Sequence, residues 1–352
     1  MIITNCNLWS SDIDEIIATL PELYDFEGKS VLITGCTGLV CSALIDTLIR
    51  WNKTHDTKIR IRAAGRSEKK ALSRFPDIIN EDWFTFVPYD AVSAKTEFDF
   101  CVDYIIHGAS NASPAKYVKE PVETMLSNFL GMKSLLDYAK EKETERVLYI
   151  SSSEVYGKKE SNQPFHTDEY GYIDLLNPRN SYSVAKRATE TLCASYTDEY
   201  GVESVIIRPG HIYGPTASVT DNRVSSAWAY AAVRGEDIVM KSDGSQLRSY
   251  CYCLDCAAAI LMALLKGESG HAYNVSNPNS VISIRDMAEI LAQSAGVKLR
   301  IDIPTSDEIK SFNPMSNSSL DSTDLLDLGW KGMFDAKRGF SHTVSILKDI
   351  IC

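Results

Sequence analysis

The sequence of 352 residues has no apolar run long enough to span a bilayer, and its first residues lack the basic and apolar regions of a secretory signal. It also has no run of basic residues, and its formal net charge is -11. These absences argue against a membrane or a nucleic acid as a partner, although a local basic site could still bind phosphates. The composition, with 44% hydrophobic and 24% charged residues, is that of an ordinary globular protein.

Nine cysteines are present, but no second Cys/His cluster closes a tetrahedral metal site. Cys251, Cys253 and Cys256 lie in a segment that is typical of a strand running into an apolar helix, and Cys251 and Cys253 should share one strand face. We interpret the three as small buried hydrophobic side chains and predict no metal. The odd cysteine number and the missing signal indicate reduced thiols in the cytoplasm.

Strands and helices alternate along the first 210 residues. Buried strand patterns occur at KSVLITG, KIRIRAAG, WFTFVPYD, DYIIHGAS, RVLYISSS and ESVIIRPG. This alternation predicts an α/β fold with a Rossmann-type doubly wound parallel sheet, covered on both faces. We assign residues 29-210 to this dinucleotide-binding domain and residues 211-352 to a smaller C-terminal α/β substrate-binding lobe, interleaved with the first. Residues 1-28 form an N-terminal extension with a short amphipathic helix that packs on the body.

A phosphate-binding turn follows the first strand. Gly35 allows the tight turn, and Gly38 lets the backbone approach a pyrophosphate at the N-terminus of the next helix. The placement of this glycine pair after the first strand of a βαβ unit strengthens the interpretation. Cys41 replaces the usual third glycine, so we expect a slight displacement of the helix without loss of binding.

The second strand ends without the acidic residue that would accept the ribose hydroxyls of NAD. Arg66 stands there and could pair with the 2′-phosphate of NADP, although it could equally face solvent beside Lys69 and Lys70. Asp90, after the third strand, is placed to touch an adenine amino group. The cofactor is therefore NAD or NADP.

Tyr182 and Lys186 stand four apart early in a helix and share one face of it. An ammonium beside a phenol favours the phenolate, which lets the tyrosine act as a general base or acid near neutral pH. The strand before this helix ends in Ser152-Ser153-Glu154. The carboxyl ends of neighbouring parallel strands share one crevice, so a serine hydroxyl could polarise a substrate oxygen beside Tyr182.

These motifs resemble the extended short-chain dehydrogenase/reductases that modify nucleotide sugars. The matching pieces cover roughly residues 29-330, in family order: TGCTGLVCS, VDYIIHGAS, YISSSEVYG, NPRNSYSVAKR, VIIRPGHIYGP and RSYCYCLD. The stretches HGASNASPAKYVKEPVET, SSSEVYG and GSQLRSYCYCLD look most like those of UDP-glucuronate decarboxylases. The resemblance implies that the substrate is a nucleotide-diphosphate sugar and that NAD is the commoner cofactor.

The resemblance also implies a shared first step, in which Tyr182 deprotonates the sugar 4-hydroxyl while hydride passes from C4 to the nicotinamide. Decarboxylation, 4,6-dehydration or epimerisation can follow. Glu154 stands where dehydratases and decarboxylases carry an acid that typical 4-epimerases lack. Ser153 replaces the aspartate of glucose-type 4,6-dehydratases, which counts against that subgroup. GDP-mannose-type dehydratases, which use NADP, fit this loop better.

The resemblance assigns roles to further residues. Catalysis falls to Tyr182, Lys186, Ser152, Ser153 and Glu154. The dinucleotide would contact Gly35, Thr37, Gly38, Leu39, Val40, Arg66, Asp90, Ala91, Gly108, Ala109, Ser110, Asn128, Ile150, Tyr182, Lys186, Pro209 and His211. The substrate would contact Ser113, Pro114, Arg223, Arg248 and Tyr213. The two arginines match positions that bind the diphosphate, for which a guanidinium fork is suited. The segment Lys310-Met315 departs from the family's basic residue and acid around a proline, so the nucleotide base stays open.

Two other functions remain open. An NADPH-dependent ketosugar reductase is favoured by Arg66 and opposed by Glu154. A non-catalytic dinucleotide sensor is opposed by the intact Tyr182, Lys186 and Ser152. The resemblance further implies a homodimer formed through the helices at 122-142 and 181-200, whose outward faces should then carry apolar residues.

Overall fold

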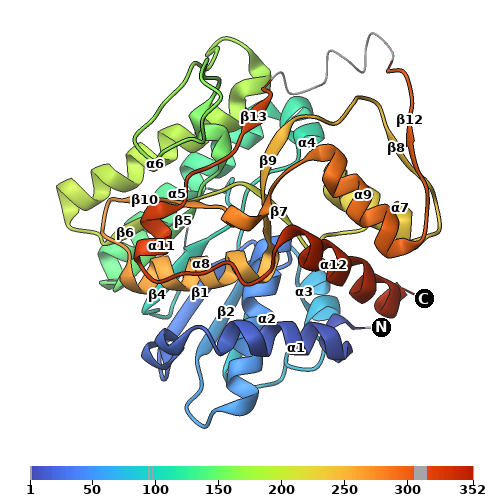
Figure 1. The fold of residues 1–352 in the computed structure, drawn as a ribbon. Coiled ribbons are helices and arrows are strands. Elements are labelled where there is room, and N and C mark those ends of the chain that lie inside the picture. Colours follow the sequence, from blue (N-terminus) through green and yellow to red (C-terminus); the bar gives the residue numbers. More distant parts are fainter. Residues whose placement is uncertain (1, 94–95, 97, 305–314, 352) are drawn as a thin grey trace.

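A seven-stranded parallel sheet forms the centre of the fold (Figure 1), which a computed structural model describes for residues 2–93, 96, 98–304 and 315–351. The strands are β1 (Ser30–Thr34), β2 (Arg60–Gly65), β3 (Phe84–Pro88), β4 (Tyr104–His107), β5 (Arg146–Ile150), β6 (Ser204–Pro209) and β10 (Ala272–Val275). Their order is β10-β6-β5-β4-β1-β2-β3, and all neighbours are parallel. The predicted Rossmann-type doubly wound α/β fold is confirmed.

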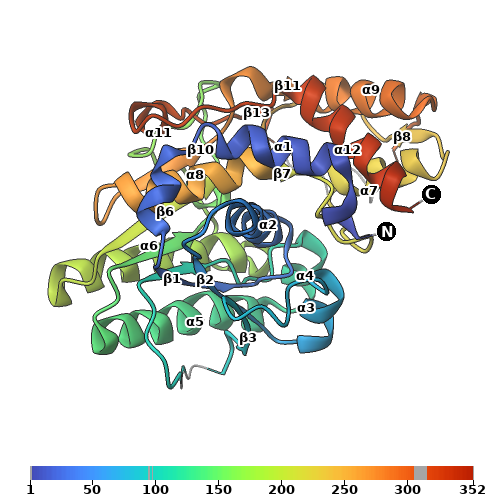
Figure 2. The ribbon, with the colours of Figure 1, turned by 90° about the horizontal axis from the view of Figure 1, so that it is seen from below.

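Helices cover both faces of this sheet, as Figure 2 shows. On one side lie α2 (Leu39–Thr54) and α8 (Cys253–Lys266), and on the other lie α5 (Pro121–Lys142) and α6 (Ser181–Tyr200). Alternate strand residues serve the two sides: Val31 and Ile33 join the cluster that contains α2 and α8, whereas Leu32 joins the cluster that contains α5 and α6. Burial on both faces explains why the strands are continuous apolar runs. Two short helices, α3 (Glu68–Arg74) and α4 (Pro114–Lys119), complete this part.

The second half of the chain builds a smaller lobe and also contributes to the main sheet. One small sheet joins β7 (His211–Tyr213), β9 (Leu247–Tyr252), β11 (Val281–Ser283) and β13 (Asn317–Ser318), and a second joins β8 (Ile238–Met240) and β12 (Leu299–Ile301). The helices of this lobe are α7 (Val224–Val233), α9 (Ile284–Ala295), α11 (Thr323–Asp327) and α12 (Ala336–Ile351). Since β10 and α8 belong to the Rossmann layers, the lobe is interleaved with them. The boundaries at residues 28 and 210 stay predictions.

The N-terminal extension consists of η1 (Ile3–Asn5), α1 (Asn7–Ile17) and η2 (Pro21–Phe26), and α1 is the expected short helix. It packs on α2, α8 and α12. Trp9 is fully buried and donates its indole N–H to Asp46 at 3.0 Å. Asp12 is also buried. Its carboxylate accepts from the Tyr252 hydroxyl at 3.1 Å and lies 2.9 Å from His342 Nδ1. The extension therefore bonds to both halves of the molecule.

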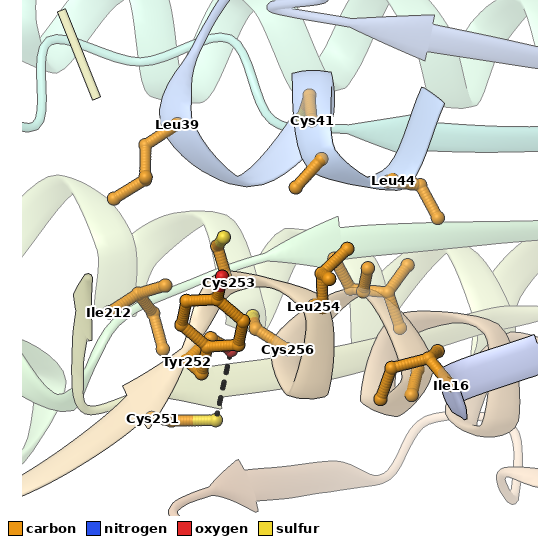
Figure 3. Close-up of a cluster of buried hydrophobic side chains, with 14 of the residues drawn as sticks. Ile16, Leu39, Cys41, Leu44, Ile212, Cys251, Tyr252, Cys253, Leu254 and Cys256 are labelled. Carbon is orange, nitrogen blue, oxygen red and sulfur yellow. Dashed lines mark hydrogen bonds between the residues drawn. The ribbon is translucent and has the colours of Figure 1, made fainter. Parts of the chain in front are cut away.

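The three closely spaced cysteines lie inside the core (Figure 3). Cys251 is in β9, but Cys253 and Cys256 belong to α8, so the expected shared strand face is wrong: the strand ends one residue before Cys253. Burial raises the pKa of all three thiols. The cysteines of the described chain are free thiols. In the same residues no helix has both the length and the apolar character needed to cross a membrane.

Candidate active site

The turn after β1 is shaped to receive an anion. Gly35 has a φ of +73°, and a Cβ there would lie 2.9 Å from the Gly108 carbonyl atoms, so only glycine fits. Gly38 is the N-cap residue of α2, and no side chain caps that helix end. Its N–H donates to the Gly35 carbonyl at 2.8 Å. Gly38 and Thr37 are exposed, so the amides of the first helical turn are open to a phosphate. These residues fit the pyrophosphate of a dinucleotide.

Cys41 is accommodated by Gly108, which directly follows β4. A Cβ on Gly108 would lie 2.3 Å from the Cys41 sulfur, so the missing side chain of Gly108 provides the room that a third glycine on α2 usually provides. The loop that carries Gly108 is held by Thr34, whose hydroxyl accepts from the amides of Gly108 and Ala109 at 3.2 Å each. The same hydroxyl lies 2.8 Å from His107 Nδ1.

The other predicted dinucleotide residues follow the ends of neighbouring strands. Arg66 comes directly after β2 and is exposed, and its side chain makes no hydrogen bond or ion pair within the described residues. Asp90, after β3, accepts from the amide of Val92 at 3.1 Å. Ser110 donates to the buried Asn128 at 3.0 Å. The remaining ones lie on the first turn (Leu39, Val40), after β3 (Ala91), and at the ends of β5 (Ile150) and β6 (Pro209) and the start of β7 (His211). These residues, His211 included, therefore lie at or after the carboxyl ends of the strands, where such folds bind ligands.

The end of β5 is bonded to one face of α6. Lys186 donates its ammonium to the Ile150 carbonyl at 2.7 Å. The Ser152 hydroxyl hydrogen-bonds with Tyr182 and accepts from the amide of Glu154 at 3.2 Å. The predicted catalytic residues are thus brought together by the spacing of four on α6 and by three successive residues of the strand end.

Burial controls the protonation of the Tyr-Lys pair. It raises the pKa of Tyr182 above its ordinary value, and Glu154 adds to this, while the Ser152 hydrogen bond and the charge of Arg223 oppose it. Burial also lowers the pKa of Lys186 to about 7, against the opposing charge of Glu190. The sequence predicts that Lys186 lowers the Tyr182 pKa; in the chain by itself the net pKa of Tyr182 is raised, because removal from water disfavours the charged forms of both residues.

Glu154 lies in the short helix η3 (Ser153–Tyr156), directly after the end of β5. Its side chain is exposed, and the Ser183 hydroxyl donates to Oε2 at 3.2 Å. Its charge raises the pKa of Tyr182 and opposes the lowering of the Arg248 pKa, so it lies within electrostatic range of both residues. Ser153 is the first residue of η3. A carboxylate therefore stands beside the tyrosine and within reach of a substrate held there.

Two arginines of the C-terminal lobe lie near this group. The Arg248 side chain is buried and donates to its neighbouring carbonyl of Leu247 at 2.7 Å. Burial lowers the Arg248 pKa. Arg223 starts α7 and pairs with Asp221, to which its Nε donates at 3.0 Å. His211 keeps contact with solvent, but surrounding protein and the charges of Arg248 and Arg223 lower its pKa to about 4.

The three other predicted substrate contacts differ in placement. Ser113 donates to Asn222 at 2.9 Å, next to Arg223, and Pro114 is the first residue of α4. Tyr213 does not join the site. Its ring is buried and stacked on Phe340, with centroids 3.6 Å apart, because the pairing of β7 with β9 turns it into the core. This placement gives no support to a substrate contact by Tyr213. The segment Lys310-Met315 lies outside the described residues except for Met315.

Sequence reasoning missed several residues of the site. Tyr117 of α4 stacks on Tyr182 with centroids 5.2 Å apart, and nothing in the sequence signals this long-range contact. Asp221 neutralises Arg223 from two residues away, a spacing that could have been noticed. Glu190 follows Lys186 by one helical turn, which is a visible signal.

The fold and this constellation define a Rossmann-type, dinucleotide-dependent enzyme. The description "NAD dependent epimerase/dehydratase family" matches residues 31–276, and the chain belongs to this family. UDP-glucuronic acid decarboxylase 1 of Xenopus tropicalis is 28% identical over 324 residues, which cover 92% of this chain and 73% of that protein. UDP-glucuronic acid decarboxylase 6 of Arabidopsis thaliana is 29% identical over 312 residues, 88% and 86% of the two chains. The fold is shared with the UDP-glucose 4-epimerase of Thermus thermophilus in complex with NAD, with a TM-score of 0.75, 21% identity and coverage of 92% and 100%.

The Cys41–Gly108 contact generates a prediction. Gly108→Ala should push the start of α2 away from the sheet, because the new Cβ cannot share space with the Cys41 sulfur. We expect a loss of about 1–3 kcal/mol in the free energy of unfolding, the usual cost of overpacking, together with weaker binding of NADH. Adding Cys41→Ala to this variant should restore most of both. Denaturant titration and NADH fluorescence measure the two effects, and a double variant no better than Gly108→Ala contradicts the assigned contact.

Proposed function

We propose that this chain transiently oxidises the sugar of a nucleotide-diphosphate sugar at C4 and then decarboxylates it, as a UDP-glucuronate decarboxylase-like enzyme. The observation that carries the proposal is the carboxylate of Glu154 beside Tyr182 and Ser152 at the end of β5. The relatives at 28–29% identity, which are UDP-glucuronic acid decarboxylases, support the same assignment.

In the first step Tyr182 takes the proton of the sugar 4-hydroxyl, and Ser152 donates a hydrogen bond to the same oxygen. A bound nicotinamide supplies the hydride acceptor and donor and, when oxidised, one positive charge. Such a charge favours the phenolate form, which offsets the effect of burial on the Tyr182 pKa. Lys186 holds the strand end and would hold the cofactor ribose. Thr37, Gly38 and the open amides after them would hold the pyrophosphate.

The second step follows from the ketone at C4. In a uronic acid the carboxylate is β to this ketone, so loss of carbon dioxide leaves an enolate that spans C4 and C5. In this proposal Glu154 takes up a proton from solvent and gives it to C5, and Tyr182 returns its proton to the 4-oxygen when the ketone at C4 is reduced again; a bound reduced nicotinamide would supply the hydride for that reduction. Arg248 and Arg223 hold the diphosphate, with Asp221 fixing the second guanidinium.

The cofactor is a nicotinamide dinucleotide, and we propose that Arg66 allows NADP as well as NAD. Its side chain is exposed and unpaired within the described residues, at the position that follows β2. The same observation favours an NADPH-dependent ketosugar reductase as the second candidate function. The presence of Glu154 favours the first.

A homodimer formed through α5 and α6 remains part of the proposal. The first turns of α5 expose Val122 (61%), Met125 (41%) and Leu126 (39%), which is the apolar surface expected. The outward face of α6 is more polar and includes the exposed Thr191 and Asp198. The apolar contact would therefore centre on the start of α5.

The assay that tests the function mixes the chain, NAD or NADP, and UDP-glucuronate, and follows the nucleotide sugars by mass spectrometry. We expect a product that has lost carbon dioxide. Tyr182→Phe should make almost none of it while still binding NADH, because the variant lacks only the proton-transfer group. UDP-glucuronate that stays unchanged, together with interconversion of UDP-glucose and UDP-galactose in a parallel assay, would assign the chain to the 4-epimerases.

Glu154→Gln separates the two steps. It keeps the shape of the side chain and removes its proton transfer, so reduction of the nicotinamide in a single turnover should persist. The later step should slow by roughly 10²–10⁴-fold, the usual contribution of general acid–base catalysis. Glu160→Gln, an exposed residue of the same loop, is the matched control and should behave as wild type. Normal product formation by Glu154→Gln would remove the acid from the mechanism and favour simple 4-epimerisation.

Arg66→Ala tests the cofactor assignment. A charge-assisted phosphate contact contributes about 1.5–3 kcal/mol, so NADP should bind roughly 10- to 150-fold more weakly while NAD binding stays unchanged. Lys69→Ala is the control on the neighbouring exposed cation. Titration of both dinucleotides by fluorescence gives the result, and equal losses for NAD and NADP would place Arg66 on an ordinary solvated surface.

A further inference from the structure

A buried carboxylate lies one helical turn beyond Lys186 on the same face of α6. Glu190 accepts hydrogen bonds from the Ser151 hydroxyl and from Arg208, whose Nε and terminal nitrogen donate at 3.1 and 2.7 Å. The side chains of Arg208 and Glu190 are only 3% and 8% exposed. An ion pair this deep is held by geometry and is little screened by water.

The Lys186 ammonium has few groups around it that could stabilise its positive charge. The Lys186 side chain is buried, and its ammonium donates a hydrogen bond to a neutral carbonyl, that of Ile150. Within the described residues, no carboxylate lies at ion-pair distance from its ammonium. The titratable groups that interact with it are Tyr149, Tyr182, Glu190, Cys193, Cys41 and His107. Among these Glu190 is the carboxylate, and its charge favours the ammonium form of Lys186.

Glu190 also fixes the position of the strand end that Lys186 binds. Ser151, its hydrogen-bond partner, sits between Ile150, which accepts from Lys186, and Ser152, which bonds to Tyr182. Arg208 in turn donates to the Tyr156 hydroxyl at 3.0 Å and the Thr167 carbonyl at 2.6 Å, so the same cluster anchors the loop after Glu154.

We propose that Glu190 is a positioning residue that keeps Lys186 charged and in register with the end of β5. The inference rests on the proposed role of Lys186 in holding the dinucleotide. It assigns Glu190 a task beyond packing: its charge acts through Lys186 on the binding of the cofactor. Burial already lowers the Lys186 pKa, and the charge of Glu190 opposes that lowering. Without this charge the ammonium form of Lys186 becomes less favourable.

The test measures NADH affinity as a function of pH by fluorescence, which needs neither the sugar nor turnover. A charged Lys186 attracts the pyrophosphate and donates to the ribose, so affinity should fall as pH rises through the Lys186 pKa. Glu190→Gln removes the charge that favours the ammonium. We expect the midpoint of this fall to move to lower pH by at least about one unit, the scale of a nearby opposite charge. Glu190→Asp, which keeps the charge, should stay near wild type.

Stability is separated from positioning by a second variant. Glu190→Gln leaves the buried Arg208 guanidinium without its carboxylate partner and should lower the Tm. Combining Glu190→Gln with Arg208→Met removes the unpaired charge and should recover much of the Tm, while the pH midpoint stays low. This double variant carries the test if Glu190→Gln does not fold. Glu199→Gln, exposed near the end of α6, is the matched control and should change neither quantity.

A wild-type pH midpoint in both Glu190→Gln and the double variant would overturn the inference and leave Glu190 a purely structural residue. A midpoint for Glu190→Asp as low as that of Glu190→Gln would overturn the electrostatic role. A chain that binds NADH with the expected pH dependence but converts no sugar would contradict the proposed function and leave this result intact.

Discussion

The hydrogen bond from the Lys186 ammonium to the Ile150 carbonyl sets the register between the catalytic helix and the end of β5. Tyr182 meets Ser152 only because that register holds, and Glu154 follows directly from the same strand end. The acceptor is a neutral carbonyl, so the bond fixes the position of the ammonium without neutralising it. The catalytic groups are therefore arranged around the Lys186 ammonium, which is buried and has no carboxylate at ion-pair distance within the described residues.

Burial shifts the pKa values of the titratable groups in this site. It pushes the pKa of Lys186 to about 7, that of His107 to about 3 and that of His211 to about 4, and it raises that of Tyr182. The common direction is toward neutral forms, because each group has lost its hydration. A charged ligand entering such a site acts on these equilibria more strongly than it would in water. The protonation of the catalytic pair is therefore set by what binds as well as by the protein.

The parts of the structure that could be predicted from the sequence depend on local patterns. Apolar runs predict the strands of the sheet. Glycines directly after the first strand predict the phosphate-binding turn, and a spacing of four residues on a helix predicts the Tyr-Lys pair. The stacking of Tyr117 on Tyr182 and the room that Gly108 gives to Cys41 depend on segments far apart in the chain, for which one sequence holds no signal. For Tyr213 the family motif predicted a substrate contact, whereas the pairing of β7 with β9 directs its ring into the core, so the structure gives that prediction no support.

The contacts of α1 have a consequence for the order in which the protein is made. Asp12 lies against His342, and Glu15 pairs with Arg338, both on α12 at the far end of the chain. Figure 2 shows the first and last helices side by side. During synthesis α1 leaves the ribosome before α12 and can pack on α2 early, but its bonds to α12 cannot form until residues 336–351 have emerged. The helix α1 is thus made well before it can reach its final set of contacts.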